Sequence, residues 1–332
     1  MDLQKVTFSV IMPCYNSESY VAAAIESIVN QTYPNWEYVI INDGSKDGTL
    51  DILNRYAEAD SRIKVFSKEN GGYVSAVNYG LEKITGDYFL MMGSDDTLDT
   101  ALFENLQRNI AQQGFAPDCI AFRTKCVTDG TVTGGDGVTE YEQLCAVQNT
   151  TFKDFSANYP DNSFVFYTRD TSKCYKREML QNLRYFGRYG IDADGIFSML
   201  LSNRGKSFMC VPCDGYYWTL RSDSVSATTS IEKFMDKINN WKLFIAELEK
   251  LPIESLPERM KTYVAWPLHF VVELAADPVN CKKYRRFIKE NAKQLLKLAQ
   301  KYYPACINTP MKIVAHSPNL YRFMYKLRSI VK

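Results

Sequence analysis

Histidine is scarce in this sequence, and its scarcity limits the catalytic chemistry to be expected. Only His269 and His316 occur among the 332 residues, and neither stands beside a plausible nucleophile. Ser-His-Asp and Cys-His catalysis both require a histidine next to the attacking serine or cysteine. We therefore expect neither kind of enzyme, and carboxylates remain as the available catalytic groups.

Cysteines in a disulfide-like spacing are also lacking. The nine cysteines are scattered, and Cys210-Val211-Pro212-Cys213 is a lone CxxC pair without a second pair. A structural zinc site would need two further ligands. We expect reduced thiols, as in a cytoplasmic protein.

Long apolar runs are absent as well. The longest candidate, residues 266–276, is too short for a membrane span and carries His269 and Glu273. Residues 1–5 lead into a strand pattern without the apolar core of a signal peptide. The sequence therefore predicts a cytoplasmic protein without a transmembrane helix.

The two common glycine-rich phosphate loops are missing too. The turn after the first expected strand, Pro13-Cys14-Tyr15-Asn16, has no glycine, so it is not a dinucleotide-binding GxGxxG turn. No GxxxxGK[ST] motif occurs, which excludes a P-loop NTPase. A fold that binds a nucleotide through acidic side chains and a metal fits better.

Strand and helix patterns alternate through the first part of the chain. Helical stripes, with apolar residues three or four apart, separate short apolar runs bounded by turn residues. These runs mark strands at residues 7–12, 36–42, 63–67, 86–92 and 119–125. The alternation predicts an α/β fold with a mainly parallel sheet covered by helices on both faces.

From residue 231 onward the pattern is helical to the end. We expect two domains: residues 1–230, which would bind the nucleotide, and a helical C-terminal region, residues 231–332. Residues 281–332 contain thirteen Lys and Arg against a single acid, Glu290, which leaves 26 against 37 for residues 1–280. The C-terminal region is thus strongly basic and the rest is acidic.

A basic region of this kind favours an anionic partner. The expected helix at residues 320–331 has an apolar face flanked by Arg and Lys, as a helix at an anionic membrane surface would. The alternative is a helix packed on the catalytic domain with a solvated basic face. Nucleic acid is not expected, because no recognised reader motif occurs.

Asp95 and Asp96 directly follow the expected strand at residues 86–92. Ligands of open parallel sheets bind outside the carboxyl ends of the strands, and oxygen groups there suit a hard divalent cation that holds a phosphate. Alternatively, Asp95, Asp96, Thr97 or Asp99 caps the following helix. Taken alone, the pair leaves both interpretations open.

Two more polar turns, at residues 15–16 and 43–45, also follow expected strands, and this clustering indicates a nucleotide site. Asp192 and Asp194 form a further acidic turn before an apolar helix, which they could simply cap. The three acidic clusters could read a base, hold a metal-diphosphate and act as general base. That division of roles fits group transfer from a nucleotide diphosphate to a hydroxyl.

Five segments resemble, in order, the sequence blocks of family 2 glycosyltransferases with the Rossmann-like GT-A fold, in particular bacterial polysaccharide-synthesising members. The segments are FSVIMPCYN (8–16), INDGSKDGT (41–49), NGGYVSAVNYG (70–80), GDYFLMMGSDD (86–96) and KCYKREML (173–180) followed by the turn at Asp192. Each block is degenerate, but five in this order are specific. The resemblance extends over residues 6–226 and does not cover residues 231–332.

The resemblance implies a role for each matching residue on the donor side. Asp95 would ligate Mn²⁺ or Mg²⁺ bridging the diphosphate, and Asp43 would hydrogen-bond uracil or another base. Arg221 would steady the leaving diphosphate, although it could equally be a surface arginine at a strand end. The remaining residues that would line the nucleotide-sugar site are Pro13, Tyr15, Asn16, Gly71, Asn78, Ser94 and Asp96.

On the acceptor side, the resemblance implies that Asp192 deprotonates the attacking hydroxyl, with Asp194 as the alternate base. The implied function is an inverting, metal-dependent glycosyltransferase of hexosyl or N-acetylhexosaminyl groups. It would move a sugar from a nucleotide-diphosphate sugar, such as a UDP-sugar, to a glycan or lipid-linked glycan. A cytoplasmic protein, peripheral on the inner face of the membrane, would suit that acceptor; the sequence does not indicate an oligomeric state.

Three positions depart from the family pattern. Gly93 stands where the metal block usually has the first aspartate of Asp-x-Asp, Val77 replaces a common arginine, and Ile191 replaces a glutamate before the base. These departures motivate an alternative, a degenerate GT-A module that binds a sugar nucleotide or a partner without catalysis.

Overall fold

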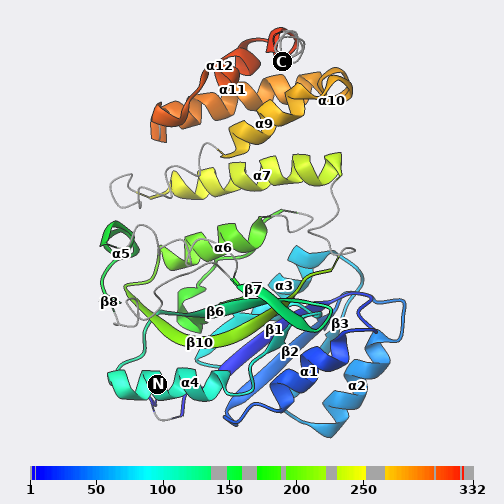
Figure 1. Ribbon diagram of the computed structural model, residues 1–332, viewed down its shortest axis with the longest axis vertical. Coiled ribbons are helices and arrows are strands. Elements are labelled where there is room, and N and C mark those ends of the chain that lie inside the picture. The colour runs from blue at the N-terminus through cyan, green and yellow to red at the C-terminus, as the bar shows by residue number, and fades with distance from the viewer. Residues whose placement is uncertain are drawn as a thin grey trace. The chain divides into compact units, whose positions relative to one another are not determined.

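The computed structural model (Figure 1) describes residues 2–3, 5–135, 148–158, 170–187, 192–221, 230–251, 266–302, 304–321 and 324. The chain divides into two compact units, Met1–Thr228 and Thr229–Lys332. Each unit is described by itself below.

A ten-stranded sheet forms the centre of the first unit, in the order β3-β2-β1-β4-β9-β6-β10-β5, with β7 and β8 paired at the side. Strands β1, β2, β3 and β4 are mutually parallel, as are β6 and β10. The bounds are β1 Phe8–Cys14, β2 Trp36–Asn42, β3 Ile63–Ser67, β4 Tyr88–Met91, β5 Thr97–Leu98, β6 Cys119–Thr128, β7 Thr131–Gly135, β8 Gln148–Asn149, β9 Lys173–Lys176 and β10 Ser207–Thr219. The expected mainly parallel α/β sheet is confirmed.

Alternation along the strands divides the core into two layers, because successive side chains point to opposite faces of a sheet. Phe8, Val10 and Met12 of β1 belong to a buried cluster with apolar residues of α1 (Val21–Val29), α2 (Thr49–Ala59) and α4 (Leu102–Gln113). On the other face, α3 (Tyr73–Leu81) packs so closely that a Cβ on Gly80 would lie 2.6 Å from Ile11 Cγ2. Helices therefore cover both faces (Figure 1).

Strand β9 was not expected from the sequence. It pairs antiparallel with β4 on one side and β6 on the other, and so joins the two parallel parts of the sheet. The strand has only four residues, and its two partners lie far away in the sequence, so no local pattern marks it. The 3₁₀ turn η3, Arg177–Met179, follows β9 directly. The first strand also extends through Pro13 to Cys14, where the sequence predicted a break.

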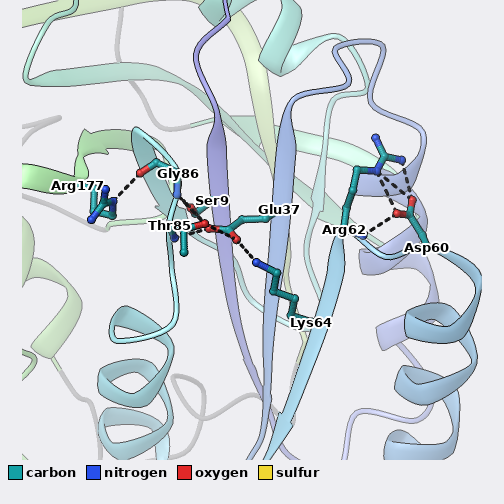
Figure 2. Close-up of polar contacts among 8 residues, drawn as sticks. All are labelled: Ser9, Glu37, Asp60, Arg62, Lys64, Thr85, Gly86 and Arg177. Atoms are coloured by element: carbon teal, nitrogen blue, oxygen red, sulfur yellow. Dashed lines mark hydrogen bonds and ion pairs between the residues drawn. The ribbon is translucent and has the colours of Figure 1, made fainter. Parts of the chain in front are cut away.

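A buried carboxylate fixes the edge of the sheet at which β2 and β4 begin (Figure 2). Glu37 accepts hydrogen bonds from Ser9 Oγ (2.7 Å) and the Gly86 amide (3.0 Å), and pairs with Lys64 Nζ at 2.6 Å. Burial alone would raise the pKa of Glu37, but these bonds and those from Thr85 outweigh it and lower the pKa to about 2. This network joins the starts of four strands, β1 to β4, at the end opposite the polar turns.

The second unit is helical in its described part. Its helices are α7 (Ile231–Leu248), α9 (Trp266–Ala276), α10 (Pro278–Lys283), α11 (Arg285–Tyr302) and α12 (Thr309–His316), with the 3₁₀ turn η5 (Pro304–Cys306). Ser230, Asp277 and Asn308 cap α7, α10 and α12 through their side chains. No helix among the described residues combines the length and apolar character that a membrane crossing requires.

Helix α11 separates apolar from basic residues. Its buried face contains Ile288, Ala292, Leu295, Ala299 and Tyr302. Its exposed basic residues are Arg285, Arg286, Lys289, Lys293, Lys297 and Lys301. Most of the basic segment expected at residues 320–331 lies outside the described residues.

Candidate functional site

The candidate site lies where the strand order reverses. Strand β1 has β2 on one side and β4 on the other, so the loops after β1 and β4 diverge from adjacent strand ends. Such switch points are where open α/β sheets bind ligands. Here the two loops meet through Ser17 and Ser94, whose hydroxyl oxygens lie 2.8 Å apart.

The loops after β1 and β2 are also joined. The Asn16 amide donates to Ser45 Oγ (3.1 Å), and Asn16 Oδ1 accepts from the Lys46 amide (2.8 Å). Asn16 has a φ of 49°, a left-handed conformation that asparagine tolerates better than most residues. Beside it, the Tyr15 side chain is 49% exposed, and Pro13 is the last residue but one of β1. The structure thus brings the three polar turns together.

Asp43 links the loop after β2 to the start of α3. Its buried carboxylate accepts from the Gly71 amide at 3.0 Å and the Gly72 amide at 2.8 Å, and pairs with Lys68 Nζ at 2.7 Å. A side chain at Gly71 would collide with Ser75 Oγ, 2.6 Å from the ideal Cβ position. Asp43 therefore shapes the entrance to α3 in this structure, and its contact with a base stays a prediction.

Asp96 is held inside the turn that follows β4. Its Oδ2 accepts from the Tyr216 hydroxyl (2.5 Å) and its Oδ1 from the Thr219 amide (2.8 Å). The Tyr216 oxygen in turn accepts from the Gly93 amide at 3.0 Å. Strand β10 thereby fixes the acidic turn, a relationship that the sequence did not reveal.

No side chain fits at position 93 in this arrangement. An ideal Cβ on Gly93 would lie 2.5 Å from Asp96 Oδ2 and 3.1 Å from Asp95 Oδ1. Since Asp96 is buried and bonded on both oxygens, it cannot simply turn away. The packing around position 93 therefore agrees with the glycine that stands there in place of the first aspartate of the Asp-x-Asp pattern.

Asp95 forms an ion pair with Arg221. Its Oδ2 lies 3.2 Å from an Arg221 guanidinium nitrogen, and the two side chains are 26% and 22% exposed. The same guanidinium lies over the Tyr20 ring, with Cζ 4.0 Å from the ring centroid. Arg221 thus bridges the end of β10 and the turn after β4.

The oxygen donors fit a divalent cation that takes most of its ligands from a phosphate. Mg²⁺ and Mn²⁺ in nucleotide sites use one or two carboxylates and draw the rest from water and phosphate. Asp95 can supply one carboxylate, whereas Asp96 is engaged with Tyr216 and Thr219. The described residues contain no cluster of three or more His, Cys, Asp or Glu side chains that could hold a metal alone.

The carboxylates of Asp95, Asp96 and Asp192 do not cap a helix. Helix α4 begins at Leu102 after β5, with no side-chain bond from its N-cap Ala101. Helix α6 (Ala193–Ser202) has Asp192 as N-cap in a left-handed conformation, again without a side-chain cap bond. The capping interpretation is therefore wrong for Asp95, Asp96 and Asp192.

Asp194 lies in the first turn of α6 and is half-buried. Burial is the main cause that raises its pKa, and the charge of Asp192 adds to it. The pKa of the Tyr73 phenol is raised mainly by burial. The negative charges of Asp170, Asp194 and Asp96 raise it further. The charges of Asp194 and of Asp96 in the turn after β4 therefore both raise the pKa of Tyr73.

Asn78 plays a structural part in the described geometry. Its side chain donates to the Tyr185 carbonyl (3.1 Å) and accepts from the Tyr185 amide (2.9 Å). Tyr185 stacks on Phe197 of α6, with ring centroids 4.1 Å apart. Asn78 thereby ties α3 to the segment before α6.

Sequence reasoning missed Asp170, Lys173, Tyr185 and Tyr216. Asp170 and Lys173 are almost completely buried, and Asp170 accepts a hydrogen bond from the Tyr185 hydroxyl. A charged pair three residues apart beside a short apolar strand was the available signal for the first two. No local signal distinguishes Tyr185 or Tyr216 among the 22 tyrosines.

Comparison with known proteins shows the family to which the chain is similar. The profile of Glycosyl transferase family 2 matches residues 9–184. The minor teichoic acid biosynthesis protein GgaB of Bacillus subtilis is 30% identical over 224 residues, 66% of this chain and 24% of GgaB. Glycosyltransferase GlyA of Streptococcus pneumoniae is 38% identical over 104 residues, 31% of this chain and 15% of GlyA.

Among solved structures, S. aureus TarS (residues 1–349, in complex with UDP-GlcNAc) superimposes with a TM-score of 0.72. It is 20% identical and covers 96% of this chain and 89% of that chain. At this identity the likeness establishes the fold, and the fold is the GT-A type. The match to curated relatives spans only part of their length, 15% of GlyA and 24% of GgaB. Because the family profile covers more than half of its residues, the chain belongs to Glycosyl transferase family 2.

Proposed function

We propose that the protein is an inverting glycosyltransferase that uses a nucleotide-diphosphate sugar, with a UDP-sugar as the first candidate. The observation that carries this proposal is the set of loops joined at the switch point, where Ser17 meets Ser94 and Asp95 remains partly exposed. Family membership supports the reaction class. The TarS structure holds UDP-GlcNAc, which makes that compound the first donor to test.

Donor binding would use the loops after β1, β2 and β4, which hydrogen bonds join to one another. Pro13, Tyr15 and Asn16 would line the nucleotide cleft, with Asp43 toward the base and Gly71, Ser94 and Asp96 shaping the site. Asn78 would act indirectly, by holding the Tyr185 backbone in the segment before α6. Asp95 would hold Mn²⁺ or Mg²⁺, which when bound supplies positive charge to the diphosphate. Arg221 adjoins Asp95 and would steady the same phosphates as the leaving group departs.

The general base is Asp194 in this proposal, with Asp192 as the alternate. Asp194 is half-buried, and this burial raises its pKa, which makes its carboxylate a stronger base. In the transfer step the carboxylate takes the proton of the acceptor hydroxyl. The hydroxyl oxygen bonds to the anomeric carbon, and the bond to the diphosphate oxygen breaks with its electron pair.

The acceptor would be a glycan or a lipid-linked glycan. We propose that residues 1–230 perform catalysis and that residues 231–332 bring the enzyme to an anionic membrane surface. The exposed basic residues of α11 support this, because each one near an anionic leaflet is worth about 1 kcal/mol.

The membrane proposal is tested by sedimentation with vesicles of phosphatidylcholine, with and without phosphatidylglycerol. We expect binding only to anionic vesicles, and loss of it on changing Lys289, Lys293 and Lys297 to glutamine. A control variant changes Lys5, Lys153 and Lys206, which are exposed in the first unit. Equal binding to both vesicle types would reject the membrane partner.

A second candidate is a GT-A module that binds a sugar nucleotide or a partner protein without catalysis. It is favoured by Gly93, where packing leaves no room for the usual aspartate. A panel of nucleotide sugars, assayed for Mn²⁺-dependent binding and slow donor hydrolysis, separates the two. Metal-dependent hydrolysis or transfer, lost with a chelator, supports the enzyme; binding without turnover supports the module.

A further inference from the structure

The side chain of Arg221 lies between an aromatic ring and a carboxylate. One guanidinium nitrogen is 3.2 Å from Asp95 Oδ2, and Cζ lies 4.0 Å from the centroid of the Tyr20 ring. Tyr20 is the N-cap residue of α1, so the three side chains come from the loops after β1 and β4 and from the end of β10. Both the ring face and the carboxylate attract the guanidinium.

The backbone that carries this ion pair is fixed, whereas its side chains are partly exposed. The Thr219 amide donates to Asp96 Oδ1 at 2.8 Å, and the Leu220 amide donates to the Val127 carbonyl at 2.8 Å. The guanidinium can therefore leave the carboxylate by rotation of its own side chain, while the backbone up to Leu220 stays in place.

A second arginine of the first unit has the same two kinds of neighbour and is held more tightly (Figure 2). Arg62 lies over the Trp36 ring, with Cζ 3.6 Å from the centroid. It donates to both oxygens of Asp60, at 2.7 Å from Nη2 and at 3.1 and 3.2 Å from Nε. Charge-assisted bonds of this kind are strongest at about 2.7–2.9 Å. The contact of Arg221 with its carboxylate is therefore the weaker and more easily exchanged of the two.

A metal ion and the guanidinium need the same carboxylate. Both oxygens of Asp96 already accept hydrogen bonds, so Asp95 is the carboxylate of this turn that can ligate Mn²⁺ or Mg²⁺. Two cations beside one carboxylate repel each other. A diphosphate changes this balance, because its oxygens accept bidentate hydrogen bonds from a guanidinium.

We propose that Arg221 and Tyr20 together make metal binding depend on the donor. The guanidinium, held over the Tyr20 ring, neutralises Asp95 and keeps the metal affinity of the protein low. When the diphosphate of a donor binds, the guanidinium moves to its oxygens, and Asp95 becomes available to the metal. The inference rests on the proposed function of Asp95 and Arg221, and it adds Tyr20 as a positioning residue.

The proposal fixes the direction and size of the coupling between metal and donor. When the binding-competent state is only partly populated, the apparent affinity for a ligand falls by that fraction. A cation–π contact at a partly exposed site changes an equilibrium by about two- to fivefold. Removing the Tyr20 ring should therefore tighten the binding of metal alone by this factor. With the donor bound the ring no longer holds the guanidinium, so metal affinity should then stay the same.

The first test measures the binding of Mn²⁺ alone to the full chain by electron paramagnetic resonance. Tyr20→Leu keeps every charge but removes the ring, and it should bind Mn²⁺ about two- to fivefold more tightly than the wild type. Tyr20→Phe keeps the ring and should bind like the wild type. Arg62→Gln, which breaks the matched ion pair just before β3, should do the same. Equal Mn²⁺ affinity in Tyr20→Leu and the wild type would overturn the proposal.

The second test uses Arg221→Gln. Loss of the guanidinium should tighten the binding of Mn²⁺ alone about fivefold, because the ion pair no longer competes for the carboxylate. It should weaken the binding of UDP-GlcNAc without metal about tenfold, because a charged partner of the diphosphate is lost. Calorimetric titration measures the second effect. A residue that only supports the fold would weaken both, and weaker binding of both ligands would refute the proposal.

Asp95→Asn separates this proposal from the proposed function. If Asp95→Asn lowers Mn²⁺ affinity while Tyr20→Leu and Arg221→Gln leave it unchanged, Asp95 is a ligand and the coupling is refuted. If Asp95→Asn binds Mn²⁺ as tightly as the wild type, the metal assignment of the proposed function fails, and the coupling fails with it. The control is Asp154→Asn, which changes an exposed aspartate of α5 (Phe152–Asn158) and should leave Mn²⁺ affinity unchanged.

Discussion

The hydroxyl of Tyr216 donates a 2.5 Å hydrogen bond to Oδ2 of Asp96 and accepts one of 3.0 Å from the Gly93 amide. One phenol therefore fixes both ends of the turn that carries Asp95. Strand β10, which supplies Tyr216, lies 120 residues further along the chain. The geometry of the candidate metal site thus depends on a distant strand.

Replacing Tyr216 with phenylalanine tests this dependence. Asp96 would lose a buried hydrogen bond to a charged group, so the free energy of unfolding should fall by about 1–3 kcal/mol. The turn should also loosen, and donor binding should weaken. Urea denaturation and calorimetric donor titration measure the two effects. Tyr217→Phe, at the next position of the same strand, serves as control; equal effects in both variants would contradict the role of Tyr216.

Restoring the family pattern with Gly93→Asp should not improve the enzyme. The new Cβ would collide with Asp96 Oδ2, so we expect a loss of about 1–3 kcal/mol in stability and no tighter donor binding. Gly93→Ala adds the same Cβ without the charge and should lose a similar amount. Thermal unfolding of both variants measures this, and a stable Gly93→Asp protein with higher donor affinity would contradict the packing argument.

Asp95→Asn should lower sugar transfer by about 100-fold or more while the fold stays intact, because the proposed metal ligand is removed. The loss of its partly exposed ion pair with Arg221 should cost less than about 1 kcal/mol in stability. Steady-state kinetics with Mn²⁺ and circular dichroism check both expectations. The control is Asp51→Asn, an exposed carboxylate of α2. Full activity of Asp95→Asn would remove the metal assignment.

Asp43→Ala should disturb the loop before α3. The carboxylate accepts from Lys68 and from the amides of Gly71 and Gly72, so its removal should cost about 2–3 kcal/mol. Amide hydrogen exchange should show faster opening at residues 68–73. If exchange there stays as slow as in the wild type while donor affinity falls, Asp43 acts on the nucleotide alone.

The lowered pKa of Glu37 predicts that acid destabilises the folded protein. Its pKa is about 2 in the folded protein and about 4.3 when unfolded, so its contribution is full above about pH 5. As the pH falls toward 2, protonation removes on the order of 3 kcal/mol. Denaturant unfolding between pH 7 and pH 2.5 should therefore show a smaller acid loss in Glu37→Gln, which is already weakened at pH 7. Equal pH slopes in Glu37→Gln and the wild type would contradict this.

The alternation of apolar runs and helical stripes was enough to predict the α/β class, and strands β2 and β3 have the predicted bounds. These patterns are local: a buried strand needs consecutive apolar residues, and a helix needs them every three or four. The three polar turns could also be placed together, because parallel strands end at the same edge of a sheet. Asp43 and Asp95 stood out as candidates for the same reason.

The partners of those candidates could not be read from the sequence. Asp96 with Tyr216, Asp95 with Arg221 and Asp170 with Tyr185 are pairs set by the order of strands and by the antiparallel insertion of β9.

The sequence by itself determined the fold class, the polar edge of the sheet and the basic character of the C-terminal region. Only the tertiary structure decided which acids are engaged, which are partly exposed and why position 93 admits no side chain. The reason is physical: hydrogen bonds and burial depend on neighbours in space, and those neighbours come from residues far apart in the chain.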